Sequence, residues 1–219
     1  MTDDELIATI RERLCTAVIG DVMDTAGLTS QFLPPRLRPV GNGAVLAGRA
    51  MTVEESDLGP HERDGSFGLM FRALDDLKPG EIYLCTGSRG DYALWGELMS
   101  TRAAALGAVG AVVDGYHRDT AGIRRRGFPV FSAGAYAQDQ RPRGRVIGFR
   151  TPLTFDNGTI VDSGDILVAD LDGVLAIPAR HAGDIVAAAL AKAGAEREIE
   201  QAIAQGETTS SVFERTGIM

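Results

Sequence analysis

Two pairs of residues in the middle of the chain have types and a spacing suited to chemistry in a shared crevice. Gly96-Glu97 opens a segment whose apolar residues recur at helical spacing, and Arg118-Asp119 follows a short apolar run that predicts a buried strand. The backbone N–H groups of a first helical turn can bind an anion such as a carboxylate. Ligands of α/β sheets gather at the carboxyl ends of the strands, so both pairs are expected at one edge of a sheet.

The side chains of these pairs suggest metal binding and oxyanion binding. Glu97 and Asp119 would offer two carboxylates to a hard divalent cation. Arg118 would offer a guanidinium group to an anionic or carbonyl oxygen. A purely structural interpretation is also open, in which Glu97 only favours the N-terminus of its helix and Arg118 pairs with Asp119 on the surface.

The elements predicted around these pairs would bring them together. Glycine and charge predict a loop over residues 87–91, and the chain then predicts a helix over 96–106, a strand over 110–113 and a helix over 120–126. Further helices are predicted over 3–14, 16–26 with Thr16 as its N-cap, 66–77, 182–205 and 210–215. Further strands are predicted over 45–53, 81–85, 130–132, 145–149, 160–161, 165–170 and 174–177, and loops over 33–39, 54–64 and 138–144. The pattern indicates a mixed α/β fold with many short strands.

Composition limits the class of protein. The chain has 219 residues, of which 44% are hydrophobic and 24% charged, so one domain over residues 1–219 is expected. The net charge of −8 argues against non-specific binding to nucleic acid or to an anionic membrane. No apolar run reaches the roughly 20 residues of a membrane span, and the acidic residues at positions 3–5 do not resemble a secretory signal. A cytoplasmic protein is expected, with Cys15 and Cys85 as buried free thiols.

The two pairs resemble a family signature. Gly96-Glu97, twenty intervening residues and Arg118-Asp119 are similar to the motif of the 4-hydroxy-4-methyl-2-oxoglutarate aldolase family, which also contains the regulators of ribonuclease E activity A. The resemblance extends over nearly the whole chain through residues 16–24, 33–39, 48–53 and 172–178. It implies a single-domain, three-layer β/β/α fold of the swivelling type, assembled as a homotrimer or homohexamer with its site near the subunit interface.

The resemblance also implies roles for individual residues. The carboxylate of a small 2-oxo acid would be bound by the backbone of the first helical turn, which comprises Gly96, Glu97, Leu98 and Met99. Arg118 would contact the carbonyl oxygen, and Asp119 would bind Mg²⁺ or Mn²⁺. The implied reaction is class II aldol cleavage of a 4-hydroxy-2-oxo acid to pyruvate and a second carbonyl compound, with Glu97 accepting the hydroxyl proton through a metal-bound water. Decarboxylation of oxaloacetate forms the same enolate and is an expected side activity.

Departures from the family pattern leave alternatives open. Glu97 stands where these aldolases often carry Asp, and residues 120–123 lack the acidic residue that often follows the Arg-Asp pair. A non-catalytic regulator that binds ribonuclease E is the main alternative, although such members tend to lose the acidic residues that this chain keeps. A methyltransferase is less favoured, because residues 87–90 lack a nucleotide-binding Gly-x-Gly-x-x-Gly context. Arg36 and Arg38 are interpreted as either solvated or directed toward a partner subunit.

Overall fold

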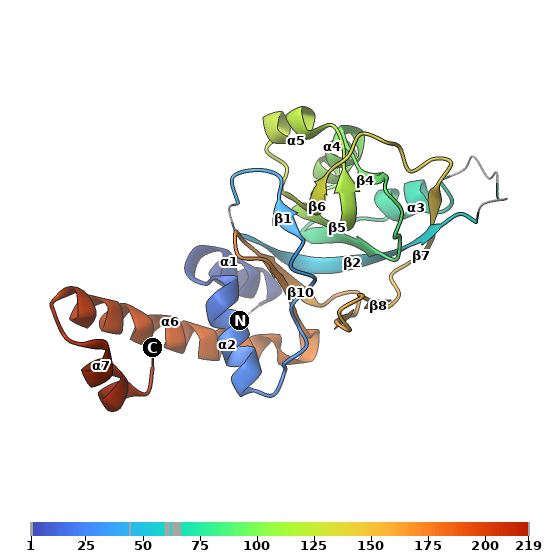
Figure 1. The fold of residues 1–219 in the computed structure, drawn as a ribbon. Coiled ribbons are helices and arrows are strands. Elements are labelled where there is room, and N and C mark those ends of the chain that lie inside the picture. The colour runs from blue at the N-terminus through green and yellow to red at the C-terminus, as the bar shows by residue number, and fades with distance from the viewer. Residues whose placement is uncertain (1, 44, 60–61, 63–66, 219) are drawn as a thin grey trace.

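A curled mixed sheet runs through the centre of the molecule (Figure 1). The computed structural model describes residues 2–43, 45–59, 62 and 67–218, and within them this sheet has nine strands. Its strands follow the order β1-β6-β5-β3-β2-β10-β11, with β4 paired to β5 and β7 paired to β2. Strands β8 and β9 form a separate small sheet.

The bounds of the elements agree with most of the predicted segments. The strands are β1 (Arg38–Pro39), β2 (Leu46–Asp57), β3 (Glu81–Thr86), β4 (Ala93–Trp95), β5 (Gly110–His117), β6 (Val130–Ala135), β7 (Gly144–Phe149), β8 (Leu153–Thr154), β9 (Ile160–Val161), β10 (Ile166–Ala169) and β11 (Val174–Ile177). The helices are α1 (Asp3–Arg13), α2 (Thr16–Thr25), α3 (Met70–Asp75), α4 (Glu97–Ala105), α5 (Thr120–Arg126), α6 (Ala182–Ala204) and α7 (Thr209–Thr216).

Layers of helix and strand cover the two faces of the main sheet. Helices α3, α4 and α5 pack on one face around a core that includes Met51, Tyr83 and Val113. The opposite face is covered by the small sheet and the segments beside it, where Leu37 and Phe155 are buried. Helices α1, α2 and α6 flank the β10–β11 end of the sheet (Figure 1). The predicted α/β class is confirmed.

The parallel strands β3, β5 and β6 position the two residue pairs. Helix α4 connects β3 and β4 to β5, and α5 connects β5 to β6, so both helices begin at the edge where the strands end. The prediction for α5 is confirmed to the residue, and α4 lies within its predicted range. Strand β5 is longer than predicted: it continues past residue 113 to His117 because its last residues pair with β4 and with the end of β6.

Strand β2 is the central element of the sheet. It pairs in parallel with β3 and antiparallel with β10 and β7. The prediction of a loop from residue 54 onward is wrong for its first residues, because pairing with β7 extends the strand to Asp57 and directs Glu55 into the core. The rest of that predicted loop, and the predicted start of the next helix at residue 66, lie largely outside the described residues.

The start of α2 also differs from the prediction. Cys15 occupies the N-cap position and makes no side-chain capping bond. Thr16 is instead the first residue of the helix, and its hydroxyl donates a 2.7 Å hydrogen bond to the buried Asp170. Because Asp170 follows β10, this contact ties α2 to the sheet. Both cysteines are free thiols, with Cys85 buried and Cys15 partly exposed.

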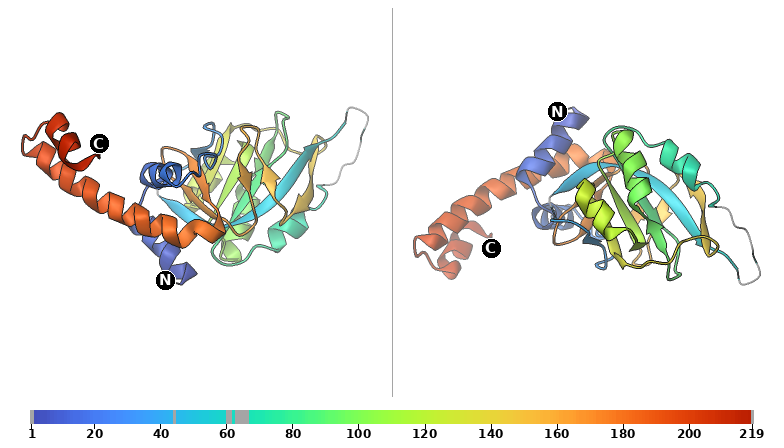
Figure 2. Two further views of the ribbon diagram at one scale, coloured as in Figure 1. Left: turned by 90° about the horizontal axis from the view of Figure 1, so that it is seen from below. Right: turned by 90° about the horizontal axis from the view of Figure 1, so that it is seen from above.

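A helical arm extends from the body of the molecule. The first half of α6 packs on the sheet through Ile185, Val186 and Ala189, whereas its far end and α7 project away (Figure 2). Helix α7 folds back on α6, with Val212 buried. Among the described residues, no helix combines the length and the apolar composition that crossing a bilayer requires.

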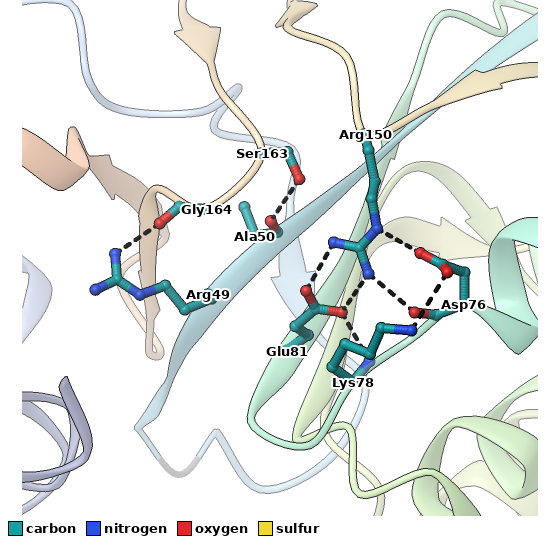
Figure 3. Close-up of polar contacts among 8 residues, drawn as sticks. All are labelled: Arg49, Ala50, Asp76, Lys78, Glu81, Arg150, Ser163 and Gly164. Atoms are coloured by element: carbon teal, nitrogen blue, oxygen red, sulfur yellow. Dashed lines mark hydrogen bonds and ion pairs between the residues drawn. The ribbon is translucent and has the colours of Figure 1, made fainter.

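Arginine side chains fix several connections between elements. Arg150, which follows β7 with a left-handed φ of 59°, donates hydrogen bonds to Asp76 after α3 and to Glu81 at the start of β3 (Figure 3). This network holds α3 against the sheet. Arg36 donates a bidentate pair of hydrogen bonds of 2.8 and 2.9 Å to the buried Asp114. Arg36 is thus bound within its own chain, and so is Arg38, which donates to the Asp172 carbonyl oxygen.

Candidate active site

The structure brings both predicted pairs together at the carboxyl edge of β5. The Glu97 backbone N–H, at the start of α4, donates a 3.2 Å hydrogen bond to Oδ2 of Asp119. The Arg118 backbone N–H donates a 2.9 Å hydrogen bond to the carbonyl oxygen of Trp95. These two bonds fix the strand end against the helix start, which is the juxtaposition that the sequence predicts.

Two backbone features permit the close approach of Asp119 to α4. A β-carbon on Gly96 would lie 2.7 Å from Oδ2 of Asp119, so a side chain at position 96 would displace the carboxylate. Asp119 itself has a left-handed φ of 61°, a conformation that Asp and Asn tolerate better than other side chains. The Asp119 carboxylate therefore points back toward the first turn of α4.

Arg118 lies between two carboxylates. Its Nε is 4.0 Å from Oδ2 of Asp119, and its Nη1 is 3.4 Å from Oδ1 of Asp139. The side chains of Arg118 and Asp119 are 40% and 46% exposed, so both are accessible to a ligand. Asp139 was not predicted as a site residue, because it lies in a loop that is distant in sequence and has no motif of its own.

The Glu97 side chain points away from Arg118 and Asp119. Its Oε1 pairs with Nη2 of Arg125 at 2.9 Å, and its carboxylate packs over Gly122 of α5, where a side chain would collide with it. The structure thus places the Glu97 backbone at the site but directs the carboxylate toward α5. Among the described residues, Asp119 and Asp139 are the carboxylates found within 4.0 Å of the Arg118 side chain.

A cavity of about 410 Å³ opens beside these residues. Gly96, Leu98 and Met99 line it from α4, and Arg118, Asp119 and Asp139 line the polar side. Its other walls come from α3 and from aromatic residues. The volume is within the range of small-molecule sites.

The donor set at this cavity is compatible with a divalent cation. Within the described residues, no group of three or more His, Cys, Asp or Glu side chains forms a ready metal cage. Mg²⁺ usually keeps several waters and uses only one or two carboxylates of the protein. Asp119, with a half-exposed carboxylate at the cavity, can supply one such ligand, and waters can complete the shell.

Comparison with known proteins decides the family. The sequence profile of the RraA-like family, described as Aldolase/RraA, matches residues 16–176. The chain belongs to the RraA-like family. The resemblance seen in the spaced Gly-Glu and Arg-Asp pairs is thereby confirmed, and both pairs of this RraA-like protein lie inside the matched segment.

Relatives of this RraA-like chain differ in length and name. Protein DlpA of Legionella pneumophila is 30% identical over 201 residues, which cover 91% of this chain, and the chain spans 32% of DlpA. A Halalkalibacterium halodurans protein named "Putative 4-hydroxy-4-methyl-2-oxoglutarate aldolase" is 27% identical over 86% of this chain and 84% of its own. The solved structure of an uncharacterized protein from Pseudomonas syringae pv. tomato is 25% identical, with a TM-score of 0.86 over 98% of this chain and 95% of its own.

In this RraA-like site, the buried His117 directly precedes the Arg-Asp pair and links the elements around it. It is 4% exposed, and its Nδ1 and Nε2 lie 2.7 Å from the Ser132 hydroxyl and 2.9 Å from the Thr120 hydroxyl. Burial lowers the pKa of His117 and favours the neutral imidazole. The residue joins β5, β6 and α5 around Arg118 and Asp119. A histidine directly before the pair was visible in the sequence, but its hydroxyl partners were not.

A buried carboxyl group is connected to the cavity through one lining residue. Gln140 lines the cavity, and its Nε2 donates a 2.5 Å hydrogen bond to Oε2 of Glu55. Glu55 is 2% exposed, and its Oε1 has no hydrogen-bond partner among the described residues. Burial, opposed by the Gln140 hydrogen bond and reinforced by the negative charge of Asp57, raises the pKa of Glu55 to about 8. Glu55 is therefore protonated at neutral pH.

We expect Glu55 to make the stability of the protein decrease as pH rises. In the unfolded chain a glutamate titrates near its ordinary value of 4.5, whereas folded Glu55 keeps its proton up to about pH 8. The folded state thus binds more protons between these values, and the free energy of unfolding falls as pH increases through that window. Glu55→Gln removes this linkage and should be more stable than the parent by on the order of a few kcal/mol at pH 8.

Thermal melts from pH 5 to pH 8 test this expectation. The difference in melting temperature between Glu55→Gln and the parent should be largest at pH 8 and should shrink toward pH 5. A constant difference over the whole range would contradict a buried, protonated Glu55. Glu54→Gln, a change at the neighbouring exposed glutamate, is the matched control and should follow the parent at each pH.

Proposed function

We propose that this protein is a divalent-metal-dependent class II aldolase that cleaves a 4-hydroxy-2-oxo acid to pyruvate and a second carbonyl compound. The observation that carries the proposal is the convergence of Arg118, Asp119 and the first turn of α4 on one cavity. Membership of a family described as Aldolase/RraA and the name of the Halalkalibacterium relative support the same class of reaction.

The first turn of α4 would bind the carboxylate of the 2-oxo acid. Helix geometry leaves the N–H groups of this turn without intrahelical acceptors, and the helix dipole favours an anion there. The N–H of Glu97 already donates to Asp119, so the backbone of Leu98, Met99 and the N-cap Gly96 is left to bind the substrate. This binding mode would direct the 2-oxo group toward Arg118.

Cleavage breaks the bond between C3 and C4 of the substrate. A base takes the proton of the C4 hydroxyl, C4 becomes a carbonyl carbon, and the bonding electrons move to the pyruvate enolate, which is then protonated at C3. Arg118 would stabilise the negative charge that develops on the enolate oxygen, because a preorganised charged donor acts most strongly where charge develops. Mg²⁺ or Mn²⁺ held by Asp119 would supply Lewis-acid stabilisation of the same oxygen.

The directions of the side chains indicate which carboxylate takes the proton of the C4 hydroxyl. Glu97, the base implied by the family resemblance, has its carboxylate paired with Arg125 on the side of α5. Asp139 is also paired with an arginine, but it lines the cavity, whereas Glu97 is not among the lining residues, so we assign the transfer of the hydroxyl proton to Asp139. The role of Glu97 in the site is then carried by its backbone.

Other features of the function remain predictions. Oxaloacetate decarboxylation would use the same enolate, and assembly as a homotrimer or homohexamer, a cytoplasmic location and the absence of nucleic-acid and membrane partners are expected from the sequence. A non-catalytic regulator of ribonuclease E would need neither Arg118 nor Asp119 at a cavity. Their joint presence there favours the enzyme over the regulator.

Metal removal is the direct test of the proposal. We expect EDTA treatment followed by desalting to abolish pyruvate release from a panel of 4-hydroxy-2-oxo acids, and we expect added Mg²⁺ or Mn²⁺ to restore it, because the metal stabilises the enolate. A coupled assay for pyruvate measures this, and EDTA already saturated with Mg²⁺ is the control. Carbon–carbon cleavage that persists unchanged after metal removal would refute the metal role.

A further inference from the structure

One wall of the candidate active site is apolar and comes from two helices and the segment before them. The apolar side chains that line the cavity from these elements are Phe67, Met70, Phe71, Leu74, Leu98 and Met99. Leu98 and Phe71 are 83% and 59% exposed, unusually high values for such large apolar side chains. The mouth of the cavity therefore offers apolar surface to any part of a ligand that extends beyond the reacting carbons.

The arginines that line the cavity among the described residues already have carboxylate partners, which disfavours a second anionic group on the ligand. The lining contains two arginines, and Arg102 is already paired with Asp75 at 2.8 Å. Arg118, the other arginine among the described lining residues, lies between Asp119 and Asp139. A ligand with a second carboxylate would place it against apolar side chains and near like charges, where an unpaired anion is costly.

We propose that the substrates are monocarboxylic 4-hydroxy-2-oxo acids with an alkyl or aryl substituent on C4. This inference rests on the proposed aldol cleavage and names its substrate class. The carboxylate would bind at the first turn of α4, and the C4 substituent would lie on the wall formed by Phe67, Phe71 and Leu98. Cleavage between C3 and C4 then gives pyruvate and an apolar aldehyde or ketone.

The apolar wall is held in place before any ligand binds. Phe67 packs edge-to-face on Phe71 with ring centroids 5.4 Å apart, and the guanidinium of Arg141 lies 5.5 Å from the centre of the Phe67 ring. Trp95, a buried residue that lines the cavity, donates a 2.7 Å hydrogen bond from its indole N–H to the hydroxyl of Ser100. A preorganised surface binds an apolar group with little cost in side-chain ordering.

Binding of two 2-oxo acids measures the preference without requiring turnover. Trp95 is the single tryptophan of the chain and lines the cavity, so its fluorescence reports ligands bound there. With Mg²⁺ present, we expect 2-oxo-4-phenylbutanoate to bind at least tenfold more tightly than 2-oxoglutarate, which carries a carboxylate in place of the phenyl group. Equal affinities, tighter binding of 2-oxoglutarate, or no binding of either acid would overturn the inference.

A charge placed on the apolar wall should reverse this preference. Phe71→Arg puts a cation where the second carboxylate of 2-oxoglutarate would lie, and we expect the ratio of the two affinities to shift by at least tenfold toward 2-oxoglutarate. Phe213→Arg is the matched control, because Phe213 is 55% exposed on α7 and does not line the cavity. A ratio that is unchanged in Phe71→Arg would overturn the placement of the substituent.

Kinetics separate this inference from the proposed reaction. We expect kcat/KM for pyruvate release from 4-hydroxy-2-oxo-4-phenylbutanoate to exceed that for 4-hydroxy-4-methyl-2-oxoglutarate by at least tenfold. A faster reaction with the dicarboxylate would overturn the substrate class while supporting aldol cleavage. Preferential binding of 2-oxo-4-phenylbutanoate without cleavage of either hydroxy acid would support the apolar ligand class and refute the aldolase.

Discussion

Replacing Arg118 with alanine is expected to lower kcat for aldol cleavage by about 10²–10³, or roughly 2.7–4 kcal/mol, because the change removes a charged donor from the developing enolate. Arg118→Lys should remain severely impaired, since lysine keeps the charge but lacks the planar fork of the guanidinium group. Stability should change little: Arg118 is 40% exposed, and an exposed ion pair contributes less than about 1 kcal/mol.

Steady-state kinetics with thermal melts distinguish a catalytic role of Arg118 from that of a surface ion-pair partner. Arg215→Ala removes an arginine from a partly exposed ion pair with Glu207 on the distal arm, so it controls for the loss of a surface charge. That variant should keep the parent's kcat. An Arg118→Ala protein with nearly normal kcat on a substrate that the parent cleaves would show that Arg118 is only a surface ion-pair partner.

Replacing Asp119 should abolish most activity by weakening metal binding. Asp119→Asn keeps an oxygen that can accept from the Glu97 N–H and tolerates the left-handed φ of 61°, but it removes the negative charge. We expect kcat at limiting Mg²⁺ to fall by about two orders of magnitude or more, a loss comparable to that of one strong charged contact. Excess Mg²⁺ should recover part of this loss, whereas Arg118→Ala should not respond to the metal.

Comparison of Asp119→Ala with Asp119→Asn separates the effect of the left-handed backbone on stability from the effect of the lost charge on metal binding. Alanine is unfavourable at a left-handed position by about 1–2 kcal/mol, so this variant should melt at a lower temperature than Asp119→Asn. Isothermal titration with Mn²⁺ should show weakened binding in both variants. Unaltered Mn²⁺ affinity in Asp119→Asn would remove Asp119 from the proposed metal site.

The local parts of this site could be predicted from the sequence. Helix α5 begins and ends where its pattern indicates, because Gly127 provides a left-handed C-cap directly after it. The convergence of Gly96 and Arg118 follows from a rule of topology, since helix starts and parallel strand ends meet at one sheet edge. Such features depend on short stretches of sequence and on a general rule of folding.

The parts that the sequence did not reveal depend on distant partners. The direction of the Glu97 carboxylate is set by Arg125 and by the absence of a side chain at Gly122, both on a different helix. Glu55 was predicted in a polar loop, and only pairing with β7 and a bond to Gln140 explain its burial. The domain count stays a prediction, and so does the assembly, which depends on contacts between chains.

The position of β2 in the sheet has a consequence for how the protein folds. Val53 pairs with Phe149 and Leu46 pairs with Ala169, so the strand needs neighbours from much later in the sequence. Pairings that are distant in sequence require closure of long loops and make folding slow. During synthesis β2 emerges long before β7 and β10, and until they arrive its apolar residues and open edges are exposed to association with other chains. The nascent chain is therefore expected to depend on chaperones more than a protein whose central strand pairs only with its sequence neighbours.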